Sequence, residues 1–159
     1  MSQKHWFKDD AAFYEAMQTY EAAVAQAPVP YQQKMVNTRY GRTHLLIGGE
    51  EKNPPLMLFH GWNGNASGVG HEFPFVFDRF RVYMPDIIGH SGKSSAERPP
   101  TKEANFANWV ADILEALALD KVYVMGVSGG GWLTLKVASF LSHRVHAAIA
   151  INPAGVTRF

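Results

Sequence analysis

The chain has 159 residues, a length at which one domain with a single hydrophobic core is expected. Apolar residues make up 47% and charged residues 18%, which is typical of a globular chain and not of a disordered one. The 15 basic and 14 acidic residues leave a formal net charge of +1, so charge gives no reason to expect nucleic acid or an anionic membrane as a partner. The absence of cysteine excludes disulfides, thiolate metal sites and a cysteine nucleophile.

The apolar runs of the chain are short. The longest, such as Ala147–Ile151, are far below the roughly 18 residues that a membrane-spanning helix needs. The first ten residues contain no apolar core of the kind found in signal peptides. We therefore expect a soluble, cytoplasmic protein.

Residues 1–30 are expected to form an N-terminal helical extension. Four apolar side chains recur there at helical spacing: Phe13, Met17, Tyr20 and Val24. Acidic residues at positions 9 and 10 favour a helix start, and prolines at 28 and 30 favour its end. We expect an amphipathic helix that packs on the main body. The alternative is a helix that docks a partner or covers a pocket.

Residues 31–159 alternate between strand and helix patterns. A β-hairpin is predicted over Tyr31–Ile47, with its turn at Tyr40–Arg42. Continuous apolar runs, typical of strands buried on both faces, follow at Leu56–Phe59, Arg81–Met84, Lys121–Met125 and Ala147–Ile151. Helical patterns lie between them at 67–77, 106–117 and 132–141, the first weakened by a proline. This order predicts an α/β fold, with a mostly parallel sheet and helices on both faces.

The strongest motif is G-x-S-x-G at Gly126–Gly130, between the run Lys121–Met125 and a helical pattern. A serine on such a turn is held in a strained backbone conformation with its hydroxyl exposed. Gly126 and Gly130 are needed because a Cβ there would meet neighbouring backbone. The helix N-terminus behind Ser128 suits a developing oxyanion. We interpret Ser128 as a nucleophile. The alternatives are a glycine-rich turn that only packs or one that binds phosphate.

A second motif, His60-Gly61-Trp62, directly follows the run Leu56–Phe59. A histidine–glycine turn at a strand end lets the next backbone N–H point inward. In an acyl-transfer site the N–H of Trp62 would be one oxyanion donor and that of Gly129 the other. His60 itself is predicted to hold the turn by hydrogen bonds.

A third motif, Asp86–Ser94, follows the run Arg81–Met84 and has the form D-x-x-G-H-S-G-K-S. Asp86 is predicted to brace this loop by accepting hydrogen bonds from backbone N–H groups. A metal site at Asp86 and His90 is the alternative, but no third ligand lies at a recognised spacing. We therefore expect neither a metal nor another cofactor.

In this order and spacing, the three motifs resemble the α/β-hydrolase superfamily, above all its capped members that cleave esters and related acyl compounds. The resemblance covers residues 31–159. It implies that Ser128 attacks the carbonyl carbon of a small-molecule acyl substrate, while a histidine takes the serine proton and an acid orients that histidine. Serine at this turn, where some relatives have aspartate, argues against haloalkane dehalogenase or epoxide hydrolase chemistry.

The family's order of catalytic residues is serine, acid, histidine, but no Asp or Glu follows Ser128 here. His143 and His146 come after a helix that would carry the chain to the opposite end of the sheet. We therefore expect an incomplete α/β-hydrolase fold that ends after its sixth strand, without the cap and the later strands that carry the acid and histidine. That strand would leave an open apolar edge, where a second chain or another copy could associate. A substitute base at His60 or His90 is the alternative.

The sequence thus predicts a serine hydrolase that acts on an ester or related acyl compound and is weakly active or inactive by itself. Oxyanion donors and binding alone leave only about 10³–10⁴-fold acceleration over water. Two alternatives stay open. One is a non-catalytic fragment or pseudoenzyme that binds a small molecule or partner. The other is an acyltransferase of the same fold, in which an alcohol replaces water as the acceptor.

Overall fold

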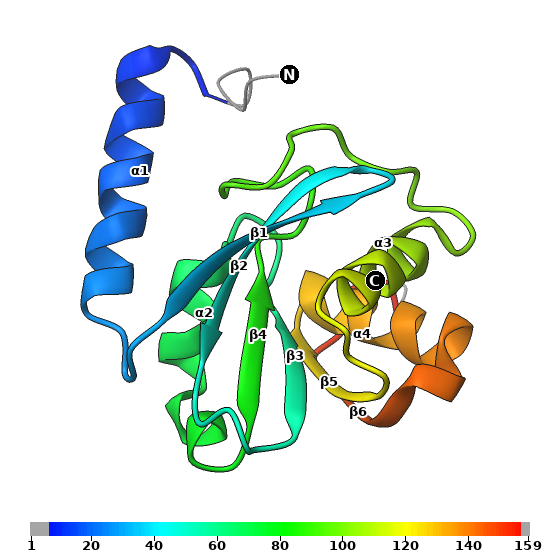
Figure 1. The fold of residues 1–159 in the computed structure, drawn as a ribbon. Coiled ribbons are helices and arrows are strands. Elements are labelled where there is room, and N and C mark those ends of the chain that lie inside the picture. The colour runs from blue at the N-terminus through cyan, green and yellow to red at the C-terminus, as the bar shows by residue number, and fades with distance from the viewer. Residues whose placement is uncertain (1–6, 157–159) are drawn as a thin grey trace.

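The computed structural model describes residues 7–156 and contains one six-stranded sheet (Figure 1). Its strands are β1 (Gln32–Thr38), β2 (Gly41–Gly48), β3 (Pro55–Phe59), β4 (Arg81–Pro85), β5 (Val122–Val127) and β6 (Val145–Ile151). The strand order is β1-β2-β4-β3-β5-β6. The β1–β2 hairpin joins β4 in antiparallel pairing, and the pairs β4–β3, β3–β5 and β5–β6 are parallel. The predicted α/β class and mostly parallel sheet are confirmed.

Helices cover both faces of this sheet. They are α1 (Asp10–Ala25), α2 (Ala66–Glu72), α3 (Asn105–Ala116) and α4 (Gly129–Phe140), with the 3₁₀ turns η2 (Pro74–Asp78) and η3 (Ser142–Arg144). The two longer predicted helices of the sheet region correspond to α3 and α4. The weak pattern at 67–77 is divided into α2 and η2, because Pro74 has no N–H to continue a helix. Within residues 7–156, no helix is both long and apolar enough to cross a bilayer.

Two apolar clusters form the core, one on each face, because neighbouring strand residues point to opposite sides of a sheet. Met57 and Phe59 of β3 pack with α3 and α4. Leu56 and Leu58 of the same strand pack with α2 and η2. Continuous apolar runs in β3 and β5 are therefore what a sheet covered on both faces requires.

β6 differs from the other parallel strands. It pairs with β5 alone, and most of its residues are exposed, including Ile149 at 58%. The expectation that all four apolar runs are buried on both faces is therefore wrong for this strand. The expected open apolar edge is observed, since none of the elements between residues 7 and 156 pairs with the outer side of β6.

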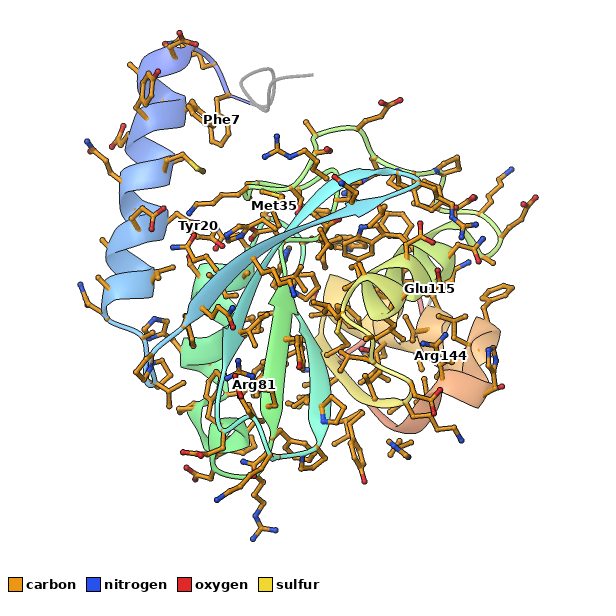
Figure 2. The ribbon with its side chains drawn as sticks, in the orientation of Figure 1. Phe7, Tyr20, Met35, Arg81, Glu115 and Arg144 are labelled. Carbon is orange, nitrogen blue, oxygen red and sulfur yellow. The ribbon has the colours of Figure 1, made fainter. Side chains whose placement is uncertain are left out.

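The predicted N-terminal helix is present as α1, which stands beside the layered body and contacts α2 (Figure 1). The Asp9 side chain accepts a hydrogen bond of 2.8 Å from the N–H of Ala12 and so caps the helix start. Tyr20 is the one fully buried side chain of α1, and it points from the helix toward the sheet (Figure 2). Near the other end, the His71 ring donates a hydrogen bond to the carbonyl of Ala23. The helix is therefore attached to the sheet by Tyr20 and to α2 near its C-terminal end.

Candidate active site

The three motifs predicted to carry chemistry lie at the carboxyl edge of the parallel strands. β3 leads into His60, β4 into Asp86 and β5 directly into Ser128. Because β3 lies between β4 and β5 in the sheet, the three loops are neighbours in space. Ligands of such sheets bind at this edge.

Ser128 occupies a strained turn between β5 and α4. Its φ of 53° and ψ of −113° lie outside the regions that side-chain-bearing residues usually adopt, at a cost on the order of 1–3 kcal/mol. Three backbone hydrogen bonds hold it there: its N–H donates to Ile151, and its carbonyl accepts from Trp132 and Ala154, at 2.9–3.0 Å. The hydroxyl does not cap α4, so it is not committed to the helix behind it. This geometry is the one that the G-x-S-x-G pattern predicts.

The flanking glycines let three backbone segments meet. A Cβ on Gly126 would lie 2.3 Å from the carbonyl oxygen of Gly130, and a Cβ on Gly130 would lie 2.2 Å from that of Phe59. Both distances are far below van der Waals contact. Glycine at these two positions is thus what brings β5, α4 and the end of β3 together beneath Ser128.

The His60-Gly61-Trp62 turn lies against the serine turn. A Cβ on Gly61 would lie 3.5 Å from Ser128 Cβ and 4.0 Å from its Oγ. The Trp62 indole covers Gly129, whose own Cβ would lie 2.3 Å from Trp62 Cδ2. The two residues predicted as oxyanion donors therefore belong to turns in direct contact.

His60 holds its turn, as predicted. The buried ring donates from Nδ1 to the carbonyl of Gly61 at 2.8 Å and accepts at Nε2 from the N–H of Ile87 at 2.9 Å. Burial lowers the pKa of His60, which favours the neutral ring that this pair of hydrogen bonds requires. Since both ring nitrogens are engaged, His60 offers no free base to Ser128.

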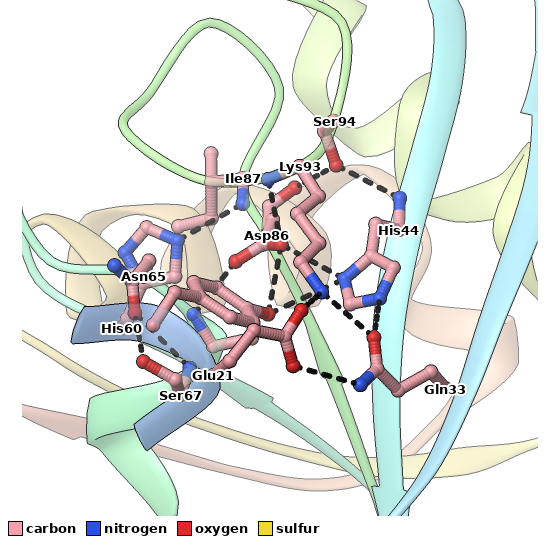
Figure 3. Close-up of polar contacts among 12 residues, drawn as sticks. Glu21, Gln33, His44, His60, Asn65, Ser67, Asp86, Ile87, Lys93 and Ser94 are labelled. Carbon is pink, nitrogen blue, oxygen red and sulfur yellow. Dashed lines mark hydrogen bonds and ion pairs between the residues drawn. The ribbon is translucent and has the colours of Figure 1, made fainter. Parts of the chain in front are cut away.

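Asp86 lies at the centre of a buried polar network (Figure 3). Its carboxylate accepts hydrogen bonds from the backbone N–H groups of Ala66 (2.8 Å) and Lys93 (2.9 Å), from the Tyr20 hydroxyl (3.0 Å) and from His44 Nδ1 (2.9 Å). Burial by itself raises the pKa of Asp86, but the His44 contact and the two N–H groups outweigh it and hold the pKa below its ordinary value. Asp86 therefore braces the loop as predicted, and it also accepts hydrogen bonds from two side chains, Tyr20 and His44.

Those added side chains were not identified from the sequence. His44 lies on β2, and Asp86 follows β4; the antiparallel register of these strands brings them together. Beyond His44, Gln33 accepts from His44 Nε2 at 3.0 Å and from Lys93 Nζ at 2.8 Å, and Lys93 forms an ion pair with Glu21 of α1 (Figure 3). The pairing of β2 with β4 could have indicated the place of His44, but not the contributions from α1 and β1.

His90 is part of an aromatic stack. Its ring lies parallel to the Trp62 indole, with centroids 4.8 Å apart, and its Nε2 accepts from Arg98 at 2.6 Å. Burial, then the charge of Arg98, lowers the pKa of His90 to about 3. A ring that binds a proton so weakly is a poor general base near neutral pH. The alternative of a substitute base at His60 or His90 therefore finds no support in this geometry.

The two later histidines lie where the sequence analysis places them. His143 belongs to η3, and His146 is near the start of β6, where its ring packs on Tyr123 at a centroid distance of 5.2 Å. That is the edge of the sheet opposite Ser128, since β5 and β6 run parallel. Across residues 7–156, no three His, Asp or Glu side chains gather in a way that could hold a metal ion.

Comparisons with known proteins identify the fold and the family. A family model described as alpha/beta hydrolase fold matches residues 54–158. The uncharacterized carboxylesterase nap of Bacillus subtilis is 32% identical over 140 residues, which cover 86% of this chain and 46% of that protein. The carboxylesterase YbfK of the same organism is 30% identical over 142 residues, which cover 89% of this chain and 47% of that protein.

The crystal structure of naproxen esterase from Bacillus subtilis superposes with a TM-score of 0.85 at 30% identity, over 92% of this chain and 51% of that one. The chain thus spans about half the length of the curated relatives that it matches.

We predict that Gly130→Ala destabilises the protein by about 2–3 kcal/mol or more, because its methyl group would press into the Phe59 carbonyl. Gly68→Ala is the matched control, since a Cβ on Gly68 of α2 meets nothing within 4 Å. This change should leave stability unchanged or raise it by up to about 1 kcal/mol. Urea unfolding of both variants is the measurement, and equal effects would contradict the packing described for the serine turn.

A second prediction concerns pH. The pKa of His90 is about 3 in the folded protein against 6.5 in the unfolded chain, so the folded state binds fewer protons between these values. The free energy of unfolding should therefore fall as pH drops from about 6.5 toward about 4. His90→Gln should make this fall shallower. Urea unfolding across that pH range compares the two proteins, and parallel curves would show that His90 does not titrate as stated.

Proposed function

This chain belongs to the alpha/beta hydrolase fold family, and from that premise we propose that Ser128 is the nucleophile of a site that cleaves carboxylic esters. The observation that carries the proposal is the strained Ser128 turn at the start of α4, with the Gly61 turn beside it. Similarity to carboxylesterases supports a hydrolase of ester type. We propose an ester of small-molecule size as substrate.

In the proposed reaction, Ser128 Oγ attacks the carbonyl carbon, and the carbonyl oxygen becomes an oxyanion. The backbone N–H groups of Trp62 and Gly129 stabilise that charge, aided by the N-terminal end of α4. The serine proton passes to a base, the alcohol leaves with a proton, and water then cleaves the acyl-serine. Glycine at 61 leaves room for the ester beside the hydroxyl, since a Cβ there would lie 4.0 Å from Ser128 Oγ.

The base is the part of this reaction that the described residues do not supply. His60 uses both ring nitrogens for structure, and the pKa of His90 is too low for the role. We therefore propose that the chain acylates slowly at Ser128 and turns over weakly unless an acid and a histidine are provided from elsewhere. Without a base, about 10³–10⁴-fold acceleration over water is the scale to expect.

The test is stoichiometric acylation by an activated ester such as p-nitrophenyl acetate. We expect one acyl group per chain, located by peptide mass spectrometry on the Ser128 peptide, and no such label in Ser128→Ala. Ser139→Ala is the matched control, because Ser139 is an exposed serine on the same helix. Labelling that persists in Ser128→Ala would remove Ser128 from the mechanism.

The same experiment separates the two alternatives. A folded chain that binds small esters but never acquires the label would be a binding protein with a hydrolase fold. A labelled chain that passes its acyl group to an added alcohol faster than to water would be an acyltransferase, identified by its ester product.

We also propose that the β6 edge is an association surface for a second chain or a second copy. A groove of about 360 Å³ adjoins this strand, between η2 and β5–β6, and its walls include Phe80, Tyr123 and Ile149. Exposed Phe75 and Ile149 make the groove apolar. An open edge strand without charged residues at its centre is prone to pair with another strand.

Sedimentation tests association. We expect self-association that increases with protein concentration and is weakened by Ile149→Lys, because a charge on the exposed edge opposes strand pairing. Met35→Lys is the matched control: Met35 is exposed on β1, the edge strand at the other end of the sheet. A monomer at every concentration would contradict pairing between copies, and equal weakening by both changes would contradict the β6 assignment.

A further inference from the structure

We infer that the Trp62 indole limits the size of the ester substituent that the site accepts. The inference rests on the proposed function and goes beyond it by naming a specificity-determining residue. The substituent concerned is the apolar group of the ester that extends over Gly129. It could belong to the acyl or the alcohol side, and the experiment below distinguishes the two.

The indole occupies the space in which a side chain of residue 129 would lie. A Cβ on Gly129 would lie 2.3, 2.6 and 2.7 Å from Trp62 Cδ2, Cε2 and Cε3. Cδ2 and Cε2 are the atoms shared by the two fused rings, so the backbone of Gly129 lies against the middle of the indole and not at its rim.

Glycine at position 129 is explained by this ring and not by the backbone. Gly129 is the first residue of α4 and has no positive φ, in contrast to Gly41, Gly49 and Gly89. A residue with a side chain could adopt its conformation. The three nearest atoms that a Cβ there would meet all belong to the Trp62 ring, so the two positions are complementary: residue 62 carries a large side chain and residue 129 carries none.

Neighbouring rings keep the indole in place. His90 stacks on it at 4.8 Å with an interplanar angle of 6°, and Trp132 of α4 lies 5.7 Å away at 46°. The Arg98 guanidinium carbon is 5.3 Å from the ring centroid, within cation–π distance, and Arg98 also donates to His90. Trp62 is nevertheless 37% exposed, so the ring is held on Gly129 and is still accessible from solvent.

A wall at this place would contact the substrate. The carbonyl oxygen of the ester points at the N–H groups of Trp62 and Gly129, and its carbon lies at Ser128 Oγ. A substituent that extends over Gly129 therefore meets the indole after a few carbon atoms. Removing the ring vacates room for several methylene groups, each worth about a fourfold change in affinity when buried.

The experiment measures binding in a Ser128→Ala background, so it requires no reactive serine. Two homologous series of amides serve as probes. N-alkyl acetamides extend the alcohol side of the corresponding ester, and N-methyl alkanamides extend its acyl side. NMR titrations give Kd against chain length. In the Ser128→Ala protein, we expect Kd to fall with the first few carbons of the probe's alkyl chain and then to stay constant. With Trp62→Ala added, Kd should keep falling about fourfold per methylene for two or three more carbons in one series.

Phe140→Ala in the same background is the matched control, because Phe140 is an exposed aromatic at the far end of α4. It should leave the chain-length limit unchanged. Trp62→Leu, which keeps an apolar side chain on the turn, should give an intermediate limit. The series that responds to Trp62→Ala identifies the side of the ester that lies over Gly129. An unchanged limit in both series would overturn the inference.

A second measurement tests the contact itself. Gly129→Ala should lower the urea midpoint in the parent chain, where its methyl group meets the indole, and much less in Trp62→Ala. Equal losses in the two backgrounds would mean that the ring does not lie on Gly129, and the inference would fall. If both measurements succeed while Ser128 resists acylation, the proposed function fails and the size limit set by Trp62 stands.

Discussion

The site depends on one close approach of main chain to main chain. Gly126 and Gly130 let the turn after β5 sit on the end of β3, with the Phe59 carbonyl where a Cβ on Gly130 would be. This contact aligns the Ser128 turn with Gly61 and sets the start of α4 behind the serine. Backbone atoms, whose positions are fixed by the sheet, thus make the arrangement rigid. Side chains then adapt to a frame that already exists.

The buried polar residues near the Ser128 turn hold the surrounding loops in place by hydrogen bonds. His60 links the loop after β3 to that after β4 through its two ring nitrogens, and Asp86 accepts four hydrogen bonds in the interior. Such buried groups are costly when unpaired, so each is fully partnered. Ser128 is the exception, with a hydroxyl that does not cap its helix. At this edge, the side chains of His60 and Asp86 are held by hydrogen bonds, whereas the Ser128 hydroxyl does not cap the helix that follows it.

The sequence was sufficient for what is local. The strand-to-helix turn at Ser128 and the role of His60 were predictable, since each depends on residues a few positions apart and on strand ends that share an edge. His44 was not, because its contact with Asp86 requires the β2–β4 register. The Trp62–Gly129 contact joins turns more than sixty residues apart, and no periodicity reports it. The open edge of β6 was predictable, but the exposure of its faces was not, because an apolar run indicates a preference for burial and not whether another element covers the strand.

The attachment of α1 by Tyr20 has a thermodynamic consequence. The phenol completes the ring of donors around Asp86, and Asp86 also holds the N–H groups of Ala66 and Lys93, one beside the loop after β3 and the other in the loop after β4. Detaching the helix would leave a buried carboxylate one donor short, at a cost of about 1–3 kcal/mol. By linkage, whatever loosens those loops weakens the hold on the helix to the same extent. The position of the first helix and the order of the loops around Ser128 are thus thermodynamically coupled.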